Sequence, residues 1–259
     1  MKIAAIQFAS TPNEPELNRQ KAISLINEAA DQGACLLVMP EFWLAGFEPQ
    51  QILDQGETLR GDTVSLLRRL ARKRQVFLVG GSLAEKRDGR LYNTVVTINE
   101  TGEIAAKYRK AHLNPQEEQI IFSPGDEWII TECNDLRLGI ISGYDIYYPE
   151  FTRNLALRGA QVLIIPLLIK ENIEEVRLLA RARALENGCF VVMANQARDT
   201  ASGGSLIISP DGRILAEAGT QDMVLISELE MNSLEHALRA RNYINYRRNI
   251  LDEIDNSQL

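Results

Sequence analysis

The stretch Leu138-Gly139-Ile140-Ile141-Ser142-Gly143-Tyr144-Asp145-Ile146-Tyr147-Tyr148-Pro149-Glu150 decides the fold. It begins with a short apolar run over 138–141, which is typical of a buried strand. The run meets Gly143, a residue that tolerates a sharp turn because it has no Cβ. An amphipathic segment over 149–158 follows and predicts a helix. A buried strand, a tight turn and a helix in this order indicate an α/β protein.

Similar units recur along the chain. Short apolar runs rich in β-branched residues predict strands over 3–8, 35–39, 76–79, 94–98, 138–141, 162–165, 190–194, 206–208 and 224–227. Amphipathic segments predict helices over 16–32, 62–74, 149–158 and 172–187. Asp-Gly and Thr-Gly turns at 88–89, 101–102 and 211–212 predict hairpins, with further strands over 104–108 and 213–217. Because strand-helix units are mixed with hairpins, we expect a four-layer αββα sandwich, with two central mixed sheets flanked by helices.

The composition excludes several classes of protein. At 259 residues, with 45% hydrophobic and 24% charged residues, the chain predicts one soluble domain over 1–251 and a tail over 252–259. Twenty-eight basic residues against thirty-five acidic ones give a net charge of −7, with no basic stripe. Nucleic acid is therefore not an expected partner. The apolar run over 3–8 is too short for a secretion signal or a membrane span, so we expect no membrane association and a cytoplasmic location.

The three cysteines, Cys35, Cys133 and Cys189, are widely spaced and follow no metal-ligand pattern. Cys35 and Cys189 lie inside or beside apolar runs, so we expect them to be buried thiols. We expect no metal and no cofactor.

Three charged positions are candidates for chemistry. Glu41 follows the predicted strand over 35–39 and so lies at a strand's carboxyl end, where ligands gather in α/β folds. Lys110 follows a hairpin strand, and Glu117 and Glu118 lie in a polar loop. Read singly, each has an ordinary interpretation as a solvated charge.

Taken together, the motifs resemble the nitrilase (carbon-nitrogen hydrolase) superfamily in order and approximate spacing. The matching segments are Pro40-Glu41, Lys110-Ala111-His112-Leu113 with the following Glu118, Phe122-Ser123-Pro124-Gly125, Gly143-Tyr144-Asp145, Pro149-Glu150 and Arg183-Ala184-Leu185-Glu186-Asn187. The resemblance extends from about residue 2 to about residue 248. In that family a cysteine precedes Tyr-Asp, and here the residue is Gly143.

The resemblance implies a role for each position. Glu41 would be the general base that takes the thiol proton. Lys110 and the backbone N–H of Tyr144 would stabilise the tetrahedral oxyanion. Glu118 would position the substrate amide and support Lys110, with Glu117 as the alternative because the register of this loop is open by one residue.

The nucleophile is missing, because glycine has no side chain that attacks a carbonyl. Ser142 is adjacent, but alternation along a strand predicts that it points away from Gly143. Two explanations for Gly143 stay open: an engineered substitution that traps a ligand or tests the nucleophile, and a natural non-catalytic member that binds without cleaving. In both cases we expect the chain to be inactive or to bind substrate only.

Tyr144-Asp145 is similar to the amidase branch, so the parent activity implied is hydrolysis of a small aliphatic amide through a Glu-Lys-Cys mechanism. Lys170 is a candidate for reading a substrate carboxylate, or is a solvated charge. The alternatives are a ligand-binding or regulatory pseudoenzyme and a scaffold protein that uses only its dimer surface. The resemblance also implies a homodimer that pairs through 149–158 and 174–187.

Overall fold

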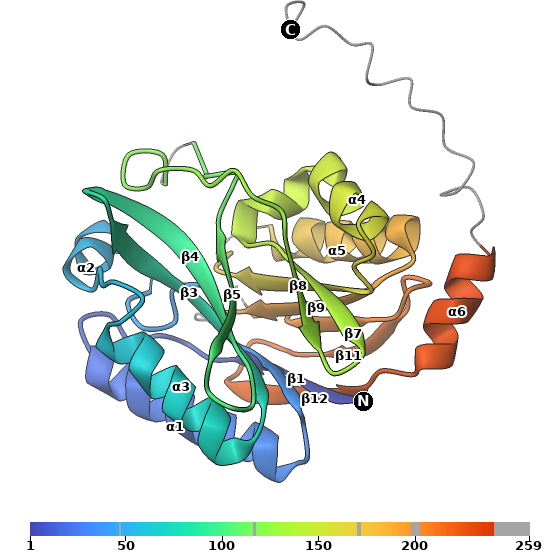
Figure 1. Ribbon diagram of the computed structural model, residues 1–259, viewed down its shortest axis with the longest axis horizontal. Coiled ribbons are helices and arrows are strands. Elements are labelled where there is room, and N and C mark those ends of the chain that lie inside the picture. The colour runs from blue at the N-terminus through green and yellow to red at the C-terminus, as the bar shows by residue number, and fades with distance from the viewer. Residues whose placement is uncertain (47, 116–117, 170–171, 198–202, 241–259) are drawn as a thin grey trace, which may run out of the picture.

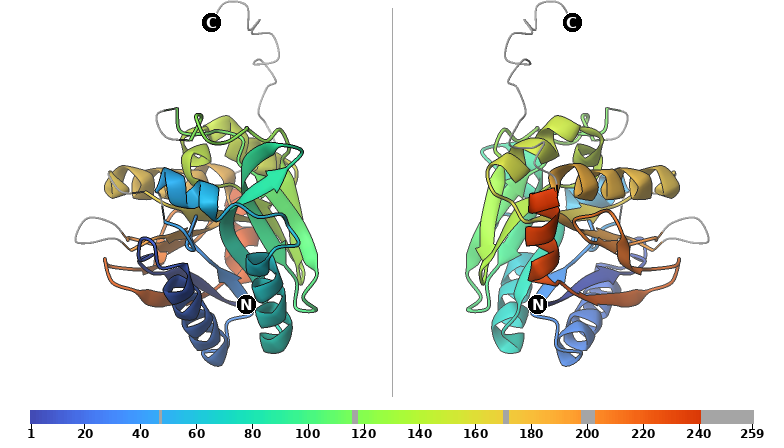
Figure 2. Two further views of the ribbon diagram at one scale, coloured as in Figure 1. Left: turned by 90° about the vertical axis from the view of Figure 1, so that its left-hand side faces the viewer. Right: turned by 90° about the vertical axis from the view of Figure 1, so that its right-hand side faces the viewer.

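The computed structural model describes residues 1–46, 48–115, 118–169, 172–197 and 203–240. Two six-stranded sheets lie face to face, and helices cover the outer face of each (Figures 1 and 2). The predicted αββα sandwich with two mixed sheets is therefore confirmed. The single domain over 1–251 stays a prediction, since residues 241–259 lie outside the described part of the chain.

The first sheet has the strand order β12-β1-β2-β3-β4-β5. Its strands are β1 (Lys2–Gln7), β2 (Leu36–Val38), β3 (Phe77–Arg87), β4 (Arg90–Ile98), β5 (Ile104–Arg109) and β12 (Met223–Glu228). The central strands β1, β2 and β3 are parallel, whereas β12, β4 and β5 join by antiparallel pairing. The predicted hairpin turns link β3 to β4 and β4 to β5.

The second sheet repeats this plan with the order β11-β10-β9-β8-β7-β6. Its strands are β6 (Ile129–Cys133), β7 (Leu136–Ile140), β8 (Val162–Leu167), β9 (Phe190–Asn195), β10 (Leu206–Ile208) and β11 (Ile214–Glu217). Strands β7, β8 and β9 are parallel to one another. Both sheets thus bring the carboxyl ends of parallel strands to one edge of the sandwich.

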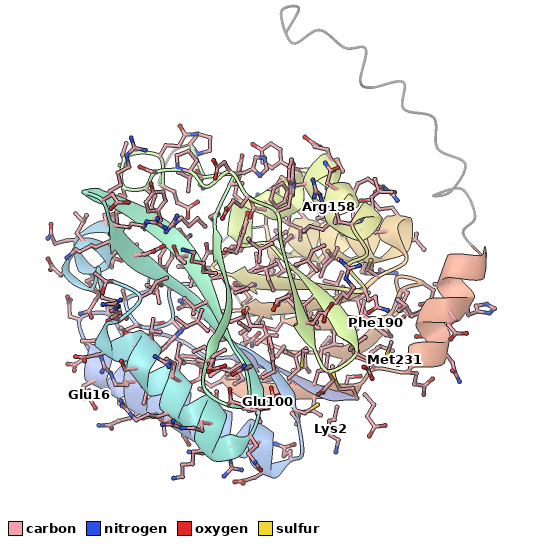
Figure 3. The ribbon with its side chains drawn as sticks, in the orientation of Figure 1. Lys2, Glu16, Glu100, Arg158, Phe190 and Met231 are labelled. Carbon is pink, nitrogen blue, oxygen red and sulfur yellow. The ribbon has the colours of Figure 1, made fainter. Side chains whose placement is uncertain are left out.

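Helices α1 (Pro15–Asp31) and α3 (Asp62–Arg74) cover the first sheet, and α4 (Pro149–Leu157) and α5 (Ile173–Asn187) cover the second. Helix α4 begins at a proline, which fits the first turn because its missing N–H has no partner there. Figure 3 shows the charged Glu16 of α1 on the outside of the molecule, whereas Phe190 lies within it.

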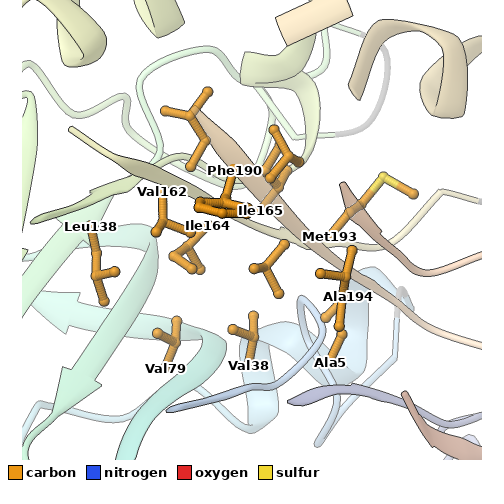
Figure 4. Close-up of a cluster of buried hydrophobic side chains, with 14 of the residues drawn as sticks. Ala5, Val38, Val79, Leu138, Val162, Ile164, Ile165, Phe190, Met193 and Ala194 are labelled. Carbon is orange, nitrogen blue, oxygen red and sulfur yellow. The ribbon is translucent and has the colours of Figure 1, made fainter. Parts of the chain in front are cut away.

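Alternate side chains of the first sheet belong to two different cores, because successive residues of a strand face opposite sides. In β1, Ile3 and Ala5 face the second sheet, whereas Ala4 and Ile6 pack on the helix side. Figure 4 shows the core between the sheets, in which Ala5, Val38 and Val79 approach Leu138 and Ile164. Burial on both faces explains why these strands are nearly continuous apolar runs.

Four elements were not predicted from the sequence: β6, helix α2 (Pro49–Asp54), the 3₁₀ helix η1 (Gly143–Tyr147) and helix α6 (Met231–Ala240). Strand β6 lies at the edge of its sheet and mixes buried and exposed positions over five residues. A pattern that short does not separate a strand from a loop.

Candidate active site

Glu41 lies where the two sheets meet. It follows β2 after Pro40, and its backbone N–H donates to the carbonyl oxygen of Leu167 at the end of β8, at 3.2 Å. Its side chain turns inward and is buried. The oxygen Oε2 accepts a hydrogen bond from the backbone N–H of Leu168 at 3.0 Å. The strand end therefore fixes both the position and the orientation of this carboxylate.

Lys110 lies between two buried carboxylates. Its Nζ is 3.0 Å from Oε1 of Glu41 and 2.7 Å from Oε2 of Glu118. Glu118 is held in turn by the loop before it, because its Oε2 accepts from the backbone N–H of Asn114 at 2.8 Å. All three charged side chains are about 3% exposed. Glu117 lies outside the described residues.

Gly143 begins η1 with φ at +48°, in the left-handed region that favours glycine. A Cβ placed on it would lie 2.5 Å from Nζ of Lys110 and 2.7 Å from Oε2 of Glu41. A side chain at this position would therefore point straight at the ammonium group and at the carboxylate. In the present chain those two groups occupy that space.

Burial and the neighbouring charges shift the pKa values of Glu41 and Lys110. Burial raises the pKa of Glu41, and the charge of Lys110 only partly opposes that effect. Burial alone would lower the pKa of Lys110, but the carboxylates of Glu41 and Glu118 more than offset it and hold the pKa above its ordinary value. Lys110 thus stays protonated at neutral pH, while Glu41 has the elevated pKa that suits a general base.

Asn93 is a member of this site that the sequence analysis missed. Its Nδ2 donates to Oε1 of Glu41 at 2.7 Å and to Oε1 of Glu118 at 2.9 Å. The residue lies in β4 and is 1% exposed. The sequence gives one indication of this role: Asn93 is a polar residue directly before the buried run over 94–98, and a buried amide needs hydrogen-bond partners.

Asp145 fastens the Lys110 loop to the turn at Gly143. Its Oδ2 accepts from the hydroxyl of Tyr108 at 2.6 Å and from the backbone N–H of Ser142 at 2.9 Å. Its Oδ1 lies 2.9 Å from the backbone nitrogen and 2.8 Å from Nδ1 of His112. The residues on either side of Lys110 are therefore tied to one fully buried carboxylate.

The expected orientation of Ser142 is wrong. Its hydroxyl turns toward the site and lies 3.1 Å from Oε1 of Glu41. The expectation assumed that strand alternation continues to residue 142, but β7 ends at Ile140 and the backbone then enters η1. Ser142 is not among the residues that line the cavity described below, and its hydroxyl is a hydrogen-bond partner of Glu41.

A small cavity of about 30 Å³ opens onto the cluster. It is lined by Glu41, Phe42, Lys110, Asn114, Glu118, Gly143, Tyr144, Leu168 and Ile169. Lys170, the candidate for reading a carboxylate, lies outside the described residues.

None of the three cysteines lines this cavity. Cys35, which was expected to be buried, is only partly buried, and its Sγ lies 3.3 Å from the backbone oxygen of Lys2. Cys133 and Cys189 are buried, and burial raises the pKa of each thiol to about 12, so neither forms the reactive thiolate at neutral pH. Within the described ranges, no group of three or more His, Cys, Asp or Glu side chains is arranged to hold a metal ion. Nor is any helix there long and apolar enough to span a membrane.

Comparison with known proteins agrees with this geometry. The family model "Carbon-nitrogen hydrolase" matches residues 2–238. An (R)-stereoselective amidase from a Pseudomonas species is 37% identical over 258 residues, covering 97% of this chain and 93% of that protein. An omega-amidase, NIT2-A of Xenopus laevis, is 32% identical over 249 residues and 90% of each chain is covered.

A solved structure is similar over almost its whole length. A cysteine-to-alanine variant of the amidase from Nesterenkonia sp. AN1, in complex with butyramide, has a TM-score of 0.81 at 30% identity and covers 95% of this chain and 97% of that one. Together the fold, the buried cluster and these matches define a hydrolase of carbon-nitrogen bonds. The chain belongs to the carbon-nitrogen hydrolase family, in its amidase-like branch.

Proposed function

We propose that this chain is an amidase scaffold that binds a small aliphatic amide beside Lys110 and does not hydrolyse it, because Gly143 stands where the nucleophile belongs. The single observation that carries this proposal is the position of the missing side chain. A Cβ at residue 143 would meet both Nζ of Lys110 and the carboxylate of Glu41, as a thiol that gives its proton to Glu41 must do.

The remaining groups keep the geometry that amide hydrolysis needs. In a chain with cysteine at position 143, Glu41 takes the thiol proton and the sulfur attacks the amide carbon. Lys110, with the backbone N–H of Tyr144, stabilises the oxyanion. The proton returns to the nitrogen as ammonia leaves, and a water molecule that gives its proton to Glu41 then hydrolyses the thioester to the acid. Glu118 holds Lys110 in place and accepts a hydrogen bond from the amide N–H₂.

Solved structures of a related amidase support a short aliphatic amide as the ligand. The Nesterenkonia amidase was solved with butyramide, a short aliphatic amide, in a variant that lacks a cysteine. In another structure of that protein acrylamide has added to its active-site cysteine. A relative without its thiol is therefore found with an amide bound, which is the behaviour proposed for this chain.

Two measurements test the proposal, one for binding and one for turnover. Calorimetry of the unmodified chain with butyramide should give weak, saturable binding that Lys110→Met abolishes, with ammonia release at background. The Gly143→Cys variant should then release ammonia from butyramide. In that variant Nζ of Lys110 has to move away from the new Cβ to an ordinary contact distance of 3.4–4 Å.

The controls separate chemistry from packing. Gly143→Ala adds the same Cβ without sulfur and should stay inactive, and Gly143→Cys combined with Glu41→Gln should lose the activity gained. Turnover by the unmodified chain, or a folded Gly143→Cys variant that neither binds nor cleaves any short amide, would overturn the proposal.

A natural pseudoenzyme that only senses or carries the ligand is the second candidate. The observation that favours it is the direct contact between Lys110 and Glu41, which closes the space left by the side chain. A glycine codon in the encoding gene supports this candidate, whereas a cysteine codon supports an engineered hydrolase. For both we propose a homodimer that pairs through α4 and α5 and a cytoplasmic location, which light scattering and cell fractionation test.

A further inference from the structure

One residue, Asn93, contacts the two carboxylates of the site through its side chain and Lys110 through its backbone. Its side-chain N–H₂ group gives one hydrogen bond to each of the two carboxylates, Glu41 and Glu118. Its backbone carbonyl oxygen accepts from the backbone N–H of Lys110 at 2.8 Å, directly after β5 ends. The relative placement of both acids and of the cation thus depends on a single position of β4.

The orientation of the Asn93 amide indicates that both carboxylates act as hydrogen-bond acceptors. Its Oδ1 is buried and has no hydrogen-bond partner among the described residues. A buried carbonyl oxygen without a partner is costly, and the amide is held this way only because its N–H₂ group faces two acceptors. Rotating the amide would bring Oδ1 against carboxylate oxygens, which is favourable only if one of them carried a proton.

The other contacts of Glu41 follow the same pattern. Besides Asn93, its carboxylate oxygens face three donors: Nζ of Lys110, the hydroxyl of Ser142 and the backbone N–H of Leu168. Every one of these contacts favours the ionised form, whereas burial and the nearby negative charge of Glu118 favour the protonated form.

We propose that Asn93 is a positioning residue that holds Glu41 and Glu118 as a pair of hydrogen-bond acceptors and thereby keeps Glu41 ionised and ready to take a proton. The inference rests on the proposed function only in giving Glu41 the role of base. The titrating and charged groups around Glu41 are Lys110, in direct contact, and Glu118, which Lys110 and Asn93 link to it, with Tyr108 and Asp145 behind them.

The test measures the proton affinity of Glu41 in the chain as it is, without catalysis. Glutamate labelled with ¹³C at its carboxyl carbon reports the titration midpoint of Glu41 by NMR, assigned by its loss in Glu41→Gln. Asn93→Leu, which keeps the volume and removes both donors, should raise the proton affinity of Glu41 about tenfold, one pH unit.

A matched control lies on the same strand. Thr97 is 1% exposed and donates to the carbonyl oxygen of Ala106 at 3.1 Å, away from the carboxylates. Thr97→Val removes one buried hydrogen bond from β4 and should leave the Glu41 midpoint where it was. Asn93→Ala removes the same two donors without adding a charge, so it should also raise the midpoint, and it decides the question if Asn93→Leu does not fold.

The outcomes separate this inference from the proposed function. A folded Asn93→Leu or Asn93→Ala protein whose Glu41 proton affinity stays within twofold of that of the unmodified chain overturns the inference, even if butyramide binds. A shifted midpoint upholds it, even if no amide binds. In the Gly143→Cys background, the lower limb of the kcat/KM pH profile should move up by the same unit with Asn93→Leu and stay in place with Thr97→Val.

Discussion

Replacing Gly143 by alanine, and Gly89 by alanine as the control, separates two free-energy costs: the cost of a left-handed backbone and the cost of displacing Lys110 and Glu41. Both glycines have left-handed backbones, with φ at +48° and +74°. A Cβ on Gly89 meets nothing within 4 Å, because the residue lies at the tip of the β3–β4 hairpin. A Cβ on Gly143 meets Nζ of Lys110 and both carboxylate oxygens of Glu41 within 3.0 Å. Only the second substitution has to move other atoms.

The magnitudes follow from these contacts. A left-handed conformation costs a residue with a Cβ about 1–2 kcal/mol, and that is the whole expected loss for Gly89→Ala. At position 143 the displaced Lys110 also loses good geometry with Glu41, and a buried hydrogen bond to a charged group contributes about 1.5–3 kcal/mol. Gly143→Ala should therefore lower the free energy of unfolding by about 3–5 kcal/mol. Any gain from a stiffer unfolded chain is common to both and cancels in the comparison.

Urea denaturation followed by circular dichroism measures both variants. The midpoint should fall about two and a half times as far for Gly143→Ala as for Gly89→Ala, at an unchanged slope. In thermal unfolding the corresponding falls in Tm are roughly 10 °C and roughly 4 °C. Equal losses for the two variants would refute the reasoning, because they would show that Lys110 and Glu41 do not occupy the space in front of residue 143.

Two further predictions concern the supports of the site. Burial raises the pKa of Glu85, but the hydrogen bonds and charge of Arg109 outweigh that effect, so the pKa is lowered overall. The pair therefore stabilises the fold at pH values above the unfolded-state pKa. This contribution is lost as the pH falls through the folded-state pKa. Glu85→Gln should destabilise the protein at pH 7 and differ less from the unmodified chain near pH 3, and a constant difference in urea midpoint across that range would contradict this. Tyr108→Phe removes the 2.6 Å hydrogen bond to the buried Asp145 and should cost about 1–3 kcal/mol in the same assay, whereas a loss near zero would show that Asp145 does not fasten this loop.

The layers of the fold were predictable from local patterns, because strands buried on both faces leave apolar runs that a reader of the sequence recognises. The short edge strand β6 was not, since its five residues alternate irregularly between buried and exposed positions. The 3₁₀ turn η1 was also missed, and with it the inward orientation of Ser142.

The candidate site was predictable only through its motif order. Glu41 and Lys110 are 69 residues apart and follow β2 and β5, two strands that β3 and β4 separate in the sheet, so no local pattern reports their contact. Asn93 lies 52 residues from Glu41 and belongs to no motif quoted from the sequence. Contacts of this kind follow from strand pairing, so they emerge only once the register of β4 and β5 is known.

The left-handed turn at Gly143 also sets the direction in which this chain changes easily. A cysteine held at φ +48° bears a backbone cost of about 1–2 kcal/mol, and the glycine chain is free of it. In the proposed function, hydrolysis requires a residue with a side chain to sustain that strain at position 143, as is common where activity and stability oppose each other. Replacing such a residue by glycine removes the backbone cost, and the reverse substitution restores it. The left-handed turn therefore makes position 143 easier to change toward glycine than away from it.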